Sequence, residues 1–137
     1  MIEFFTRRIF ILRWQQARTS AARGNDRRAV TIFRSLTPPP NLVSICSAQM
    51  ADSYFRLGRF TDAYSLYSSA LRQEEQFTSR ARSANGVYIM SYCQYYMNAI
   101  AEHQGADELP FAEHEVEAGL GNTSVNRRLR EFHLPRP

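Results

Sequence analysis

The side chains that could carry out acid–base or metal chemistry are scattered along this chain. His103, His114 and His133 are isolated from one another, and no two histidines lie four residues apart with a glutamate between them. The triplet Glu-His-Glu at 113–115 points its side chains to different faces of a helix, so they cannot converge on one ion. The sequence contains no glycine-rich phosphate loop and no nucleophile elbow. We therefore expect no metal site, no cofactor and no catalytic activity.

The two cysteines show no reactive pattern either. Cys46 and Cys93 fall within separate predicted helices, and their spacing matches neither a zinc site nor a redox pair. We expect two reduced thiols that are partly buried in the core.

Charge is unevenly distributed along the chain. All 17 basic residues are arginine, and the sequence pI is about 9.4. Residues 1–36 carry eight arginines and two acidic residues, whereas residues 104–121 carry five acidic residues and no basic one. The two segments are expected to attract each other, and the basic one also suits contacts to phosphate groups.

The elements that must position any binding residue are clearest between residues 51 and 71. Two apolar stripes with helical spacing meet there at Gly58. The first stripe is Ala51, Tyr54 and Leu57, and the second is Ala63, Tyr67, Ala70 and Leu71. Because glycine readily takes the left-handed conformation that ends a helix, the pattern predicts a helical hairpin. Its alanines let the two helix axes approach closely.

This stretch resembles the tetratricopeptide repeat. The family's order of small residue, aromatic, glycine, aromatic, alanine, aromatic and alanine is matched by Ala51, Tyr54, Gly58, Phe60, Ala63, Tyr67 and Ala70. The chain departs from the family at Ser47, Met50 and Glu75, where a large residue, a leucine and a proline are usual. The resemblance implies stacked helical hairpins that bind other proteins.

The pattern recurs 34 residues upstream, which is the period of this family. Ala17, Gly24, Ala29 and Phe33 fall in phase with the central hairpin. Downstream, Ala84 and Tyr88 keep the phase of the first helix, but Tyr92 stands where the glycine should be. We therefore expect hairpin turns at Gly24 and Gly58, and one long helix, or a helix with a late bend, over residues 78–104.

The predicted fold is all-α, with about two and a half stacked hairpins of tetratricopeptide type closed by this long helix and a short helical tail. Residues 1–104 form the helical domain, with an elbow at the prolines 38–40 between the first two hairpins. Residues 105–137 form an acidic linker and a C-terminal helix that packs on the domain or on a partner.

Local signals place several helix ends. Asn25 or Asp26 is expected to cap the second helix, and Thr78 or Ser79 to open the third element. In the tail, residues 113–117 suit a short acidic helix. The final helix is predicted to have Val125, Leu129 and Phe132 on one face.

The first helix is predicted to place Phe5, Ile9, Leu12 and Gln16 on one side. Its extra turns cover the end of the stack or lie on an anionic membrane surface. Because the segment is rich in arginine and poor in acids, it also resembles a mitochondrial targeting segment, so mitochondria are the alternative to a cytoplasmic location. No stretch approaches 18 apolar residues, so we expect no transmembrane segment.

The family resemblance also implies which residues contact a partner. The groove-facing positions of the first helices correspond to Trp14, Arg18, Asp52, Phe55 and Arg56, and less securely to Ile89. We expect the fold not to depend on either arginine. On the third helix, Tyr92 and Tyr96 lie one turn apart and either pack inside the protein or belong to the partner surface.

The function that follows is a non-catalytic scaffold or adaptor, which binds a peptide or helix of a partner protein as part of a larger assembly. Two alternatives stay open. The basic charge with interleaved aromatic residues suits an RNA- or ribosome-associated protein. Small secretion-type chaperones also resemble three consecutive repeats in a chain of similar length.

Overall fold

The computed structural model describes residues 2–77 and 82–137, and all regular elements within these ranges are helical. They are α1 (Ile2–Ala22), α2 (Asp26–Ser35), a 3₁₀ turn (Pro40–Leu42), α3 (Val43–Arg56), α4 (Phe60–Gln76), α6 (Ala84–His103), α7 (Glu113–Leu120) and a π-helical turn (Leu129–His133). The predicted all-α fold is confirmed. None of these helices is both long enough and apolar enough to cross a membrane.

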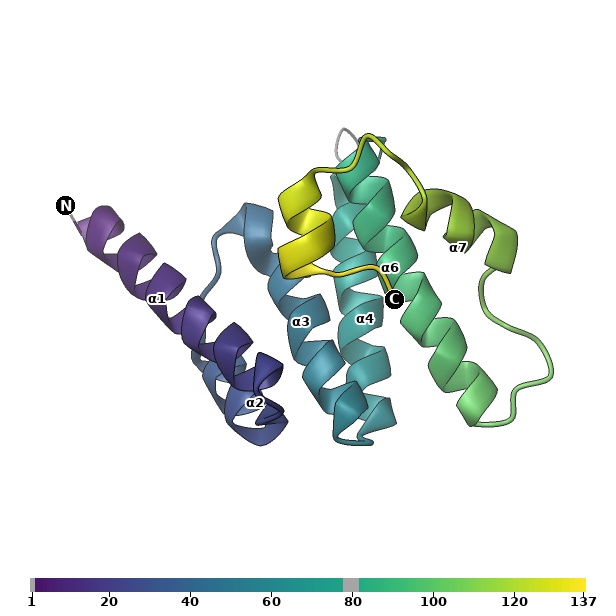
Figure 1. Ribbon diagram of the computed structural model, residues 1–137, viewed down its shortest axis with the longest axis horizontal. Helices are drawn as coiled ribbons and strands as arrows, with labels where there is room; N and C mark the ends of the chain where they lie inside the picture. Colours follow the sequence, from purple (N-terminus) through teal and green to yellow (C-terminus); the bar gives the residue numbers. More distant parts are fainter. Residues whose placement is uncertain (1, 78–81) are drawn as a thin grey trace.

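The first four helices form two antiparallel hairpins, α1 with α2 and α3 with α4 (Figure 1). The turns fall at Gly24 and Gly58, as predicted, and both glycines have positive φ angles, +81° and +76°. After each glycine, a backbone N–H reaches back to close the helix: Asn25 to Ser20 O at 2.8 Å, and Arg59 to Tyr54 O at 2.9 Å. Only glycine takes this left-handed conformation without strain, which is why the turns stand out in the sequence.

The helix caps confirm one prediction and correct another. Asn25 caps α2, because its Oδ1 accepts a hydrogen bond from the Arg28 N–H at 3.2 Å. The third element begins later than residue 78: α6 starts at Ala84, and the Ser83 hydroxyl accepts from the Gly86 N–H at 3.1 Å. The alternative starts at Thr78 and Ser79 lie outside the described residues.

The helix α6 passes through the position where a third hairpin turn would fall. It runs for 20 residues to His103, and Gly105, whose φ is +79°, follows its end. Tyr92 therefore lies inside the helix and is buried. The structure confirms one long helix that ends near residue 104, but this helix begins at Ala84 and not at residue 78.

The buried face of α1 differs from the predicted one. Phe10, Trp14 and Ala17 are buried, whereas Phe5, Ile9 and Leu12 are each more than half exposed and Gln16 is exposed. Both sets have helical spacing, because the N-terminal half of α1 is apolar on nearly all sides. Periodicity alone could not decide which stripe faces the rest of the protein.

The helices are arranged in two layers with the tail in front. Helices α1, α3 and α6 lie side by side on one face, and α2 and α4 lie behind them (Figure 1). The C-terminal turn lies across α3 and α6 on the front face, and α7 packs on α6. One face of the layer formed by α1, α3 and α6 is therefore turned toward the C-terminal segment.

The tail places its apolar residues differently from the prediction. Val125 and Leu129 are buried as expected, but Phe132 is 69% exposed. The Leu134 N–H bonds to Leu129 O at 2.8 Å, five residues back, so the last turn is wider than an α-helix. Leu134 is consequently the residue that turns inward, and it is fully buried.

Candidate functional site

A cavity of about 310 Å³ lies between the front helices and the C-terminal tail. The helices line it with Arg18, Gln49, Asp52, Arg56, Tyr92 and Tyr96, and the tail closes it with Phe132, His133 and Pro135. We call the helix side of this cavity, which the tail covers, the central groove. Five of the seven predicted partner-binding residues thus meet in one place, and only Trp14 and Phe55 do not line it.

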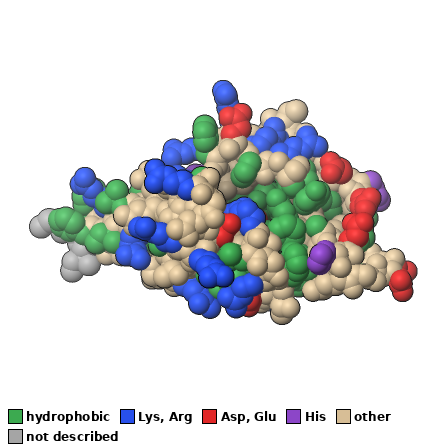
Figure 2. Space-filling view, turned by 60° about the horizontal axis from the view of Figure 1, so that its bottom comes forward, with side chains coloured by type: hydrophobic (Ala, Val, Ile, Leu, Met, Phe, Trp, Pro, Cys, Tyr) green, Lys and Arg blue, Asp and Glu red, His purple; other side chains and the backbone are tan. Residues whose placement is uncertain are grey.

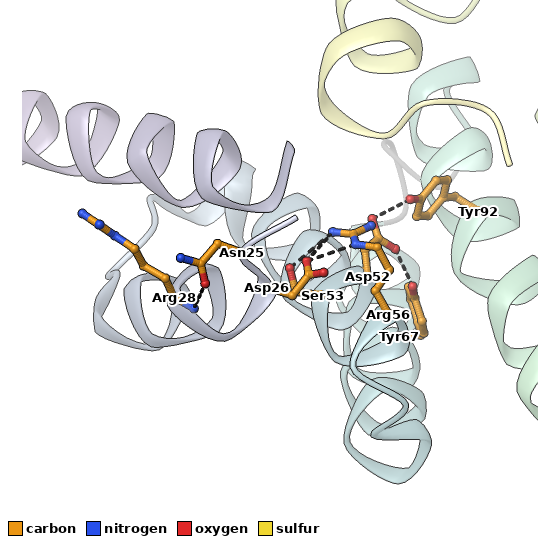
Figure 3. A network of polar contacts seen from close by, with 8 residues as sticks. All are labelled: Asn25, Asp26, Arg28, Asp52, Ser53, Arg56, Tyr67 and Tyr92. Carbon is orange, nitrogen blue, oxygen red and sulfur yellow. Dashed lines mark hydrogen bonds and ion pairs between the residues drawn. The ribbon is translucent and has the colours of Figure 1, made fainter. Parts of the chain in front are cut away.

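Asp52 lines the central groove, and Figure 3 shows its contacts with Tyr67 and Tyr92. One carboxylate oxygen accepts a hydrogen bond from the Tyr67 hydroxyl, and the other accepts from the Tyr92 hydroxyl at 2.6 Å. The side chain therefore ties α3 to both α4 and α6. Burial raises the pKa of Asp52 to about 6, although the two tyrosine hydrogen bonds and the nearby Arg56 act in the opposite direction.

The tyrosines around Asp52 form a packed aromatic group. Tyr67 stacks on Tyr96 with ring centroids 5.1 Å apart, and Tyr92 also contacts Tyr96 at 5.1 Å. Burial, together with the adjacent Asp52 carboxylate, raises the pKa of both Tyr67 and Tyr92 well above the ordinary value. Both hydroxyls consequently stay protonated and remain donors. Tyr92 packs, whereas the half-buried Tyr96 both packs and lines the groove.

Arg56 links the two hairpins and is not simply a free partner-binding group. Its guanidinium pairs with Asp26 at the start of α2 at 3.0 Å and also donates to the Ser53 hydroxyl at 3.4 Å (Figure 3). The Asp26 side chain is only 9% exposed, whereas that of Arg56 is 48% exposed. This ion pair weighs against the expectation that the fold does not depend on Arg56. About half of its side chain still faces solvent.

Arg18 lies at the edge of the central groove. Its guanidinium sits over the Trp14 ring, 4.7 Å from the centroid. Burial lowers the pKa of Arg18, and the positive charge of Arg128 in the tail lowers it further. No ion pair of Arg18 is found within the described residues. A cation of the groove thus faces a cation of the tail.

Trp14 supports the groove from below. It is buried, its indole N–H donates to Gln49 Oε1 at 2.6 Å, and its ring packs on Phe10 at 5.6 Å and on His133 at 4.9 Å. Phe55 lies at the other end of α3, where its ring contacts Phe60 at 5.4 Å and Tyr96 at 5.2 Å.

Ile89, the less secure family-derived position, is buried in the core. It has too little exposed surface to contact a partner directly.

The tail is held mainly through its backbone. The Gln49 amide donates to His133 O at 2.9 Å, and the Tyr88 hydroxyl donates to Leu134 O at 2.6 Å. Sequence reasoning missed Gln49 and Tyr88 as site residues. A signal was present, since Gln49 precedes Asp52 by about one helical turn, and Tyr88 precedes Tyr92 by one turn. Polar groups in a buried stripe need partners, and these two find theirs in the tail.

The carboxylate of the site is fully hydrogen-bonded, and the two thiols are buried. Both oxygens of Asp52 already accept hydrogen bonds, and both cysteines are free and buried, as expected. Within the described parts of the chain, no three His, Cys, Asp or Glu side chains are grouped so that they could hold a metal ion. What the groove offers is an aromatic wall, two backbone-capturing donors and two partly exposed guanidinium groups.

Charge on the surface follows the distribution in the sequence. In the space-filling view, most basic side chains lie toward the left and the bottom, and most acidic ones lie along the right edge (Figure 2).

Comparisons with protein families, curated proteins and solved structures gave no match to this chain.

Proposed function

We propose that this chain is a non-catalytic protein-binding scaffold of tetratricopeptide type, and that the central groove holds a short segment of a partner protein. The observation that carries the proposal is the tail itself. Residues 129–135 lie across the front helices as a separate peptide would, with two backbone carbonyls captured by Gln49 and Tyr88. Groups that capture backbone carbonyls suit a peptide of variable sequence.

Two features of the helices support the stacking of this type. Glycine-capped hairpin turns recur with a spacing of 34 residues at Gly24 and Gly58. The first helix of each hairpin also faces the same side as α6, so these helices together line one groove.

An affinity capture experiment with the full chain tests the proposal. Arg18→Glu changes the charge at the rim of the groove, and Arg72→Glu makes the same change at an exposed position on α4. Partners of the groove should be captured by wild type and by Arg72→Glu but lost with Arg18→Glu. Equal capture by both variants would show that the groove is not the site.

Salt dependence separates a protein partner from RNA. Contacts to several phosphates would make the affinity fall steeply as salt rises, whereas an aromatic groove with few charges gives a shallow dependence. A steep dependence that survives Arg18→Glu would favour the RNA-associated alternative.

The outer face of α1 favours a second contact, with an anionic lipid surface. Phe5, Ile9 and Leu12 form an exposed apolar stripe, and helical spacing places Arg8 and Arg13 on either side of it. An apolar stripe flanked by arginines is the arrangement that binds at the headgroup region of a bilayer. Cosedimentation with phosphatidylserine vesicles should be lost in a Phe5→Ser, Leu12→Ser variant. Phosphatidylcholine vesicles are the control, and equal binding to both lipids would contradict the arginine contribution.

A further inference from the structure

The tail fills the central groove incompletely. Within the described residues, Arg130 Nε and His133 Nε2 are buried nitrogen atoms that have no hydrogen-bond partner, and both belong to the tail. Leaving a buried polar atom unpaired removes its hydration without replacing it. The tail therefore keeps two buried nitrogen atoms unsatisfied in its resting position.

Charge is mismatched along the same contact. Arg18 and Arg128 line one cavity of about 710 Å³ beside the tail, and neither has an ion pair within the described residues. Burial lowers the pKa of Arg18, and the positive charge of Arg128 lowers it further. Arg127, which also lines this cavity, pairs with Glu131 at 3.1 Å. Arg128 is therefore the arginine of the tail beside this cavity whose charge has no ion pair among the described residues.

The buried side chains and the hydrogen-bonded carbonyls of the tail indicate which groups a partner segment needs in order to bind there. Leu129 and Leu134 are buried, and the His133 ring lies on Trp14. The carbonyl oxygens of His133 and Leu134 accept from Gln49 and Tyr88, which any peptide backbone can provide. Two buried leucines five residues apart and an aromatic ring on Trp14 are therefore the side chains through which the tail packs on the protein.

We propose that residues 129–135 are a displaceable internal occupant of the central groove, and that the partner is a leucine-bearing helical segment with an acidic residue at the position of Arg128. This inference rests on the proposed function and adds the chemistry of the partner. An acidic group there would replace a repulsion with Arg18 by an attraction, while the leucines and carbonyls keep the contacts of the tail. A partner segment of this kind would bind better than the tail and release it.

Three fluorescently labelled peptides and the full chain test the proposal. One peptide has the unchanged sequence of residues 123–137, and the other two carry Arg128→Glu or Arg136→Glu, so that the net charges of these two variants are equal. Arg136 pairs with Glu117 at 3.2 Å in the intact chain, so its reversal adds a repulsion. Fluorescence anisotropy should show that the Arg128→Glu peptide binds about three- to tenfold more tightly than the unchanged peptide. The Arg136→Glu peptide should bind more weakly than the unchanged one.

Reversing the charge of Arg18 in the chain tests whether Arg18 contacts position 128 of the bound peptide. With the Arg18→Glu chain, the order of affinities should reverse, because the unchanged peptide now meets an opposite charge and the Arg128→Glu peptide meets a like charge. Such a reversal marks a direct coupling between the two positions. If the order stays the same, or if the two charge-reversed peptides bind equally, Arg18 does not face position 128 and the proposal is wrong.

Competition with the internal tail is tested by variants of the tail. Leu134→Glu places a charge at a fully buried site and should unseat the tail, and His133→Ala is a milder change that removes only the ring on Trp14. Both variant chains should bind the Arg128→Glu peptide more tightly than wild type does. Trp14 is the only tryptophan, so its fluorescence reports the loss of the His133 ring from the groove. Unchanged affinity in both variants would contradict displacement.

The inference and the proposed function fail in different ways. A captured partner that depends on Arg18 but is unaffected by His133→Ala or Leu134→Glu leaves the groove as the site and overturns the displaceable tail. A second outcome that overturns it is exchange of tails between copies, which sedimentation velocity would reveal as a dimer that the peptides dissociate. If no partner depends on the groove but both tail variants still tighten peptide binding, the proposed function alone is contradicted.

Discussion

Asp52 connects three helices through a single carboxylate. Its two oxygens accept from tyrosines on α4 and α6, and the side chain is removed from water by the surrounding core. An ionised carboxylate at such a site is costly unless its hydrogen bonds compensate for the lost hydration. The pKa of about 6 shows that the compensation is incomplete.

The pH dependence of stability follows from this pKa. Because the pKa of Asp52 is raised from 3.8 to about 6 on folding, its contribution to stability is present below pH 3.8 and is lost as the pH rises through 6. Asp52→Asn removes this titration while keeping one acceptor for a tyrosine. The free energy of unfolding of the variant relative to wild type should rise by on the order of 2–3 kcal/mol between pH 4 and 7. Urea denaturation at several pH values measures it, and a constant difference would contradict the assignment.

Asp26 and Arg56 show how a residue predicted to bind a partner also serves the fold. Arg56→Ala leaves the nearly buried Asp26 carboxylate without its partner, so it should destabilise the protein by about 1 kcal/mol or more. Arg127→Ala is the matched control, because Arg127 pairs with Glu131 at an exposed site and should contribute almost nothing. The expected effect of Arg56→Ala should largely disappear in an Asp26→Asn background. Equal destabilisation by the two alanine variants would contradict the linking role.

Among the elements, the hairpins were the part that the sequence predicted best. Gly24 and Gly58 mark their turns because a left-handed residue is a local requirement that only glycine meets without strain. The start of α6 was not predicted correctly, and the sequence did not indicate which face of α1 is buried. Both depend on which of several apolar stripes finds a neighbouring helix, and that is decided by tertiary contacts.

The close approach of the hairpin helices gives the next prediction. Ala51 and Ala63 are fully buried where α3 and α4 pack together. Ala63→Arg buries an unpaired charge and Ala51→Trp overfills the interface, so each should destabilise by several kcal/mol and unfold the domain. Thermal melting followed by circular dichroism measures this. A melting temperature within a few degrees of wild type would show that the helices do not pack through these alanines.

The contact between α7 and α6 depends on one glycine. A Cβ atom at Gly119 would lie 1.9 Å from Ser91 Oγ and 2.8 Å from Ser91 Cβ. Gly119→Ala should therefore destabilise the protein by about 1–3 kcal/mol, although alanine is the better helix former by about 1 kcal/mol. Ser91→Gly should restore much of the loss, since it removes both clashing atoms. Stabilisation by Gly119→Ala alone would mean that α7 is not seated against Ser91.

The whole molecule is organised by contacts between distant parts of the chain. The tail touches residues of α1, α3 and α6 that lie about 45 to 120 positions earlier, including Trp14, Gln49 and Tyr88. Five of the predicted partner-binding residues line the central groove, because the hairpin register fixes which side of each first helix faces forward. The sequence could not predict that the tail would lie there, since a short segment with two leucines has no local signal for its position.

The charge asymmetry of the chain was only partly informative at this scale. It predicted attraction between the basic N-terminal and the acidic 104–121 segment, yet the ion pairs found among the described residues join neighbouring elements or near residues. Among these ion pairs, the one that involves the acidic segment joins Glu117 to Arg136, and Arg136 belongs to the tail.

Amide hydrogen exchange of the full chain tests most directly whether the central groove is a binding surface that the tail occupies at rest. In the free protein, the Leu134 N–H bonded to Leu129 O should exchange slowly. Saturation with the Arg128→Glu peptide should make this amide exchange at the rate of an unstructured chain, while the amides of α3 and α6 stay protected. If the peptide binds and the Leu134 amide remains protected, the tail has not left and the peptide binds elsewhere, which would contradict the account.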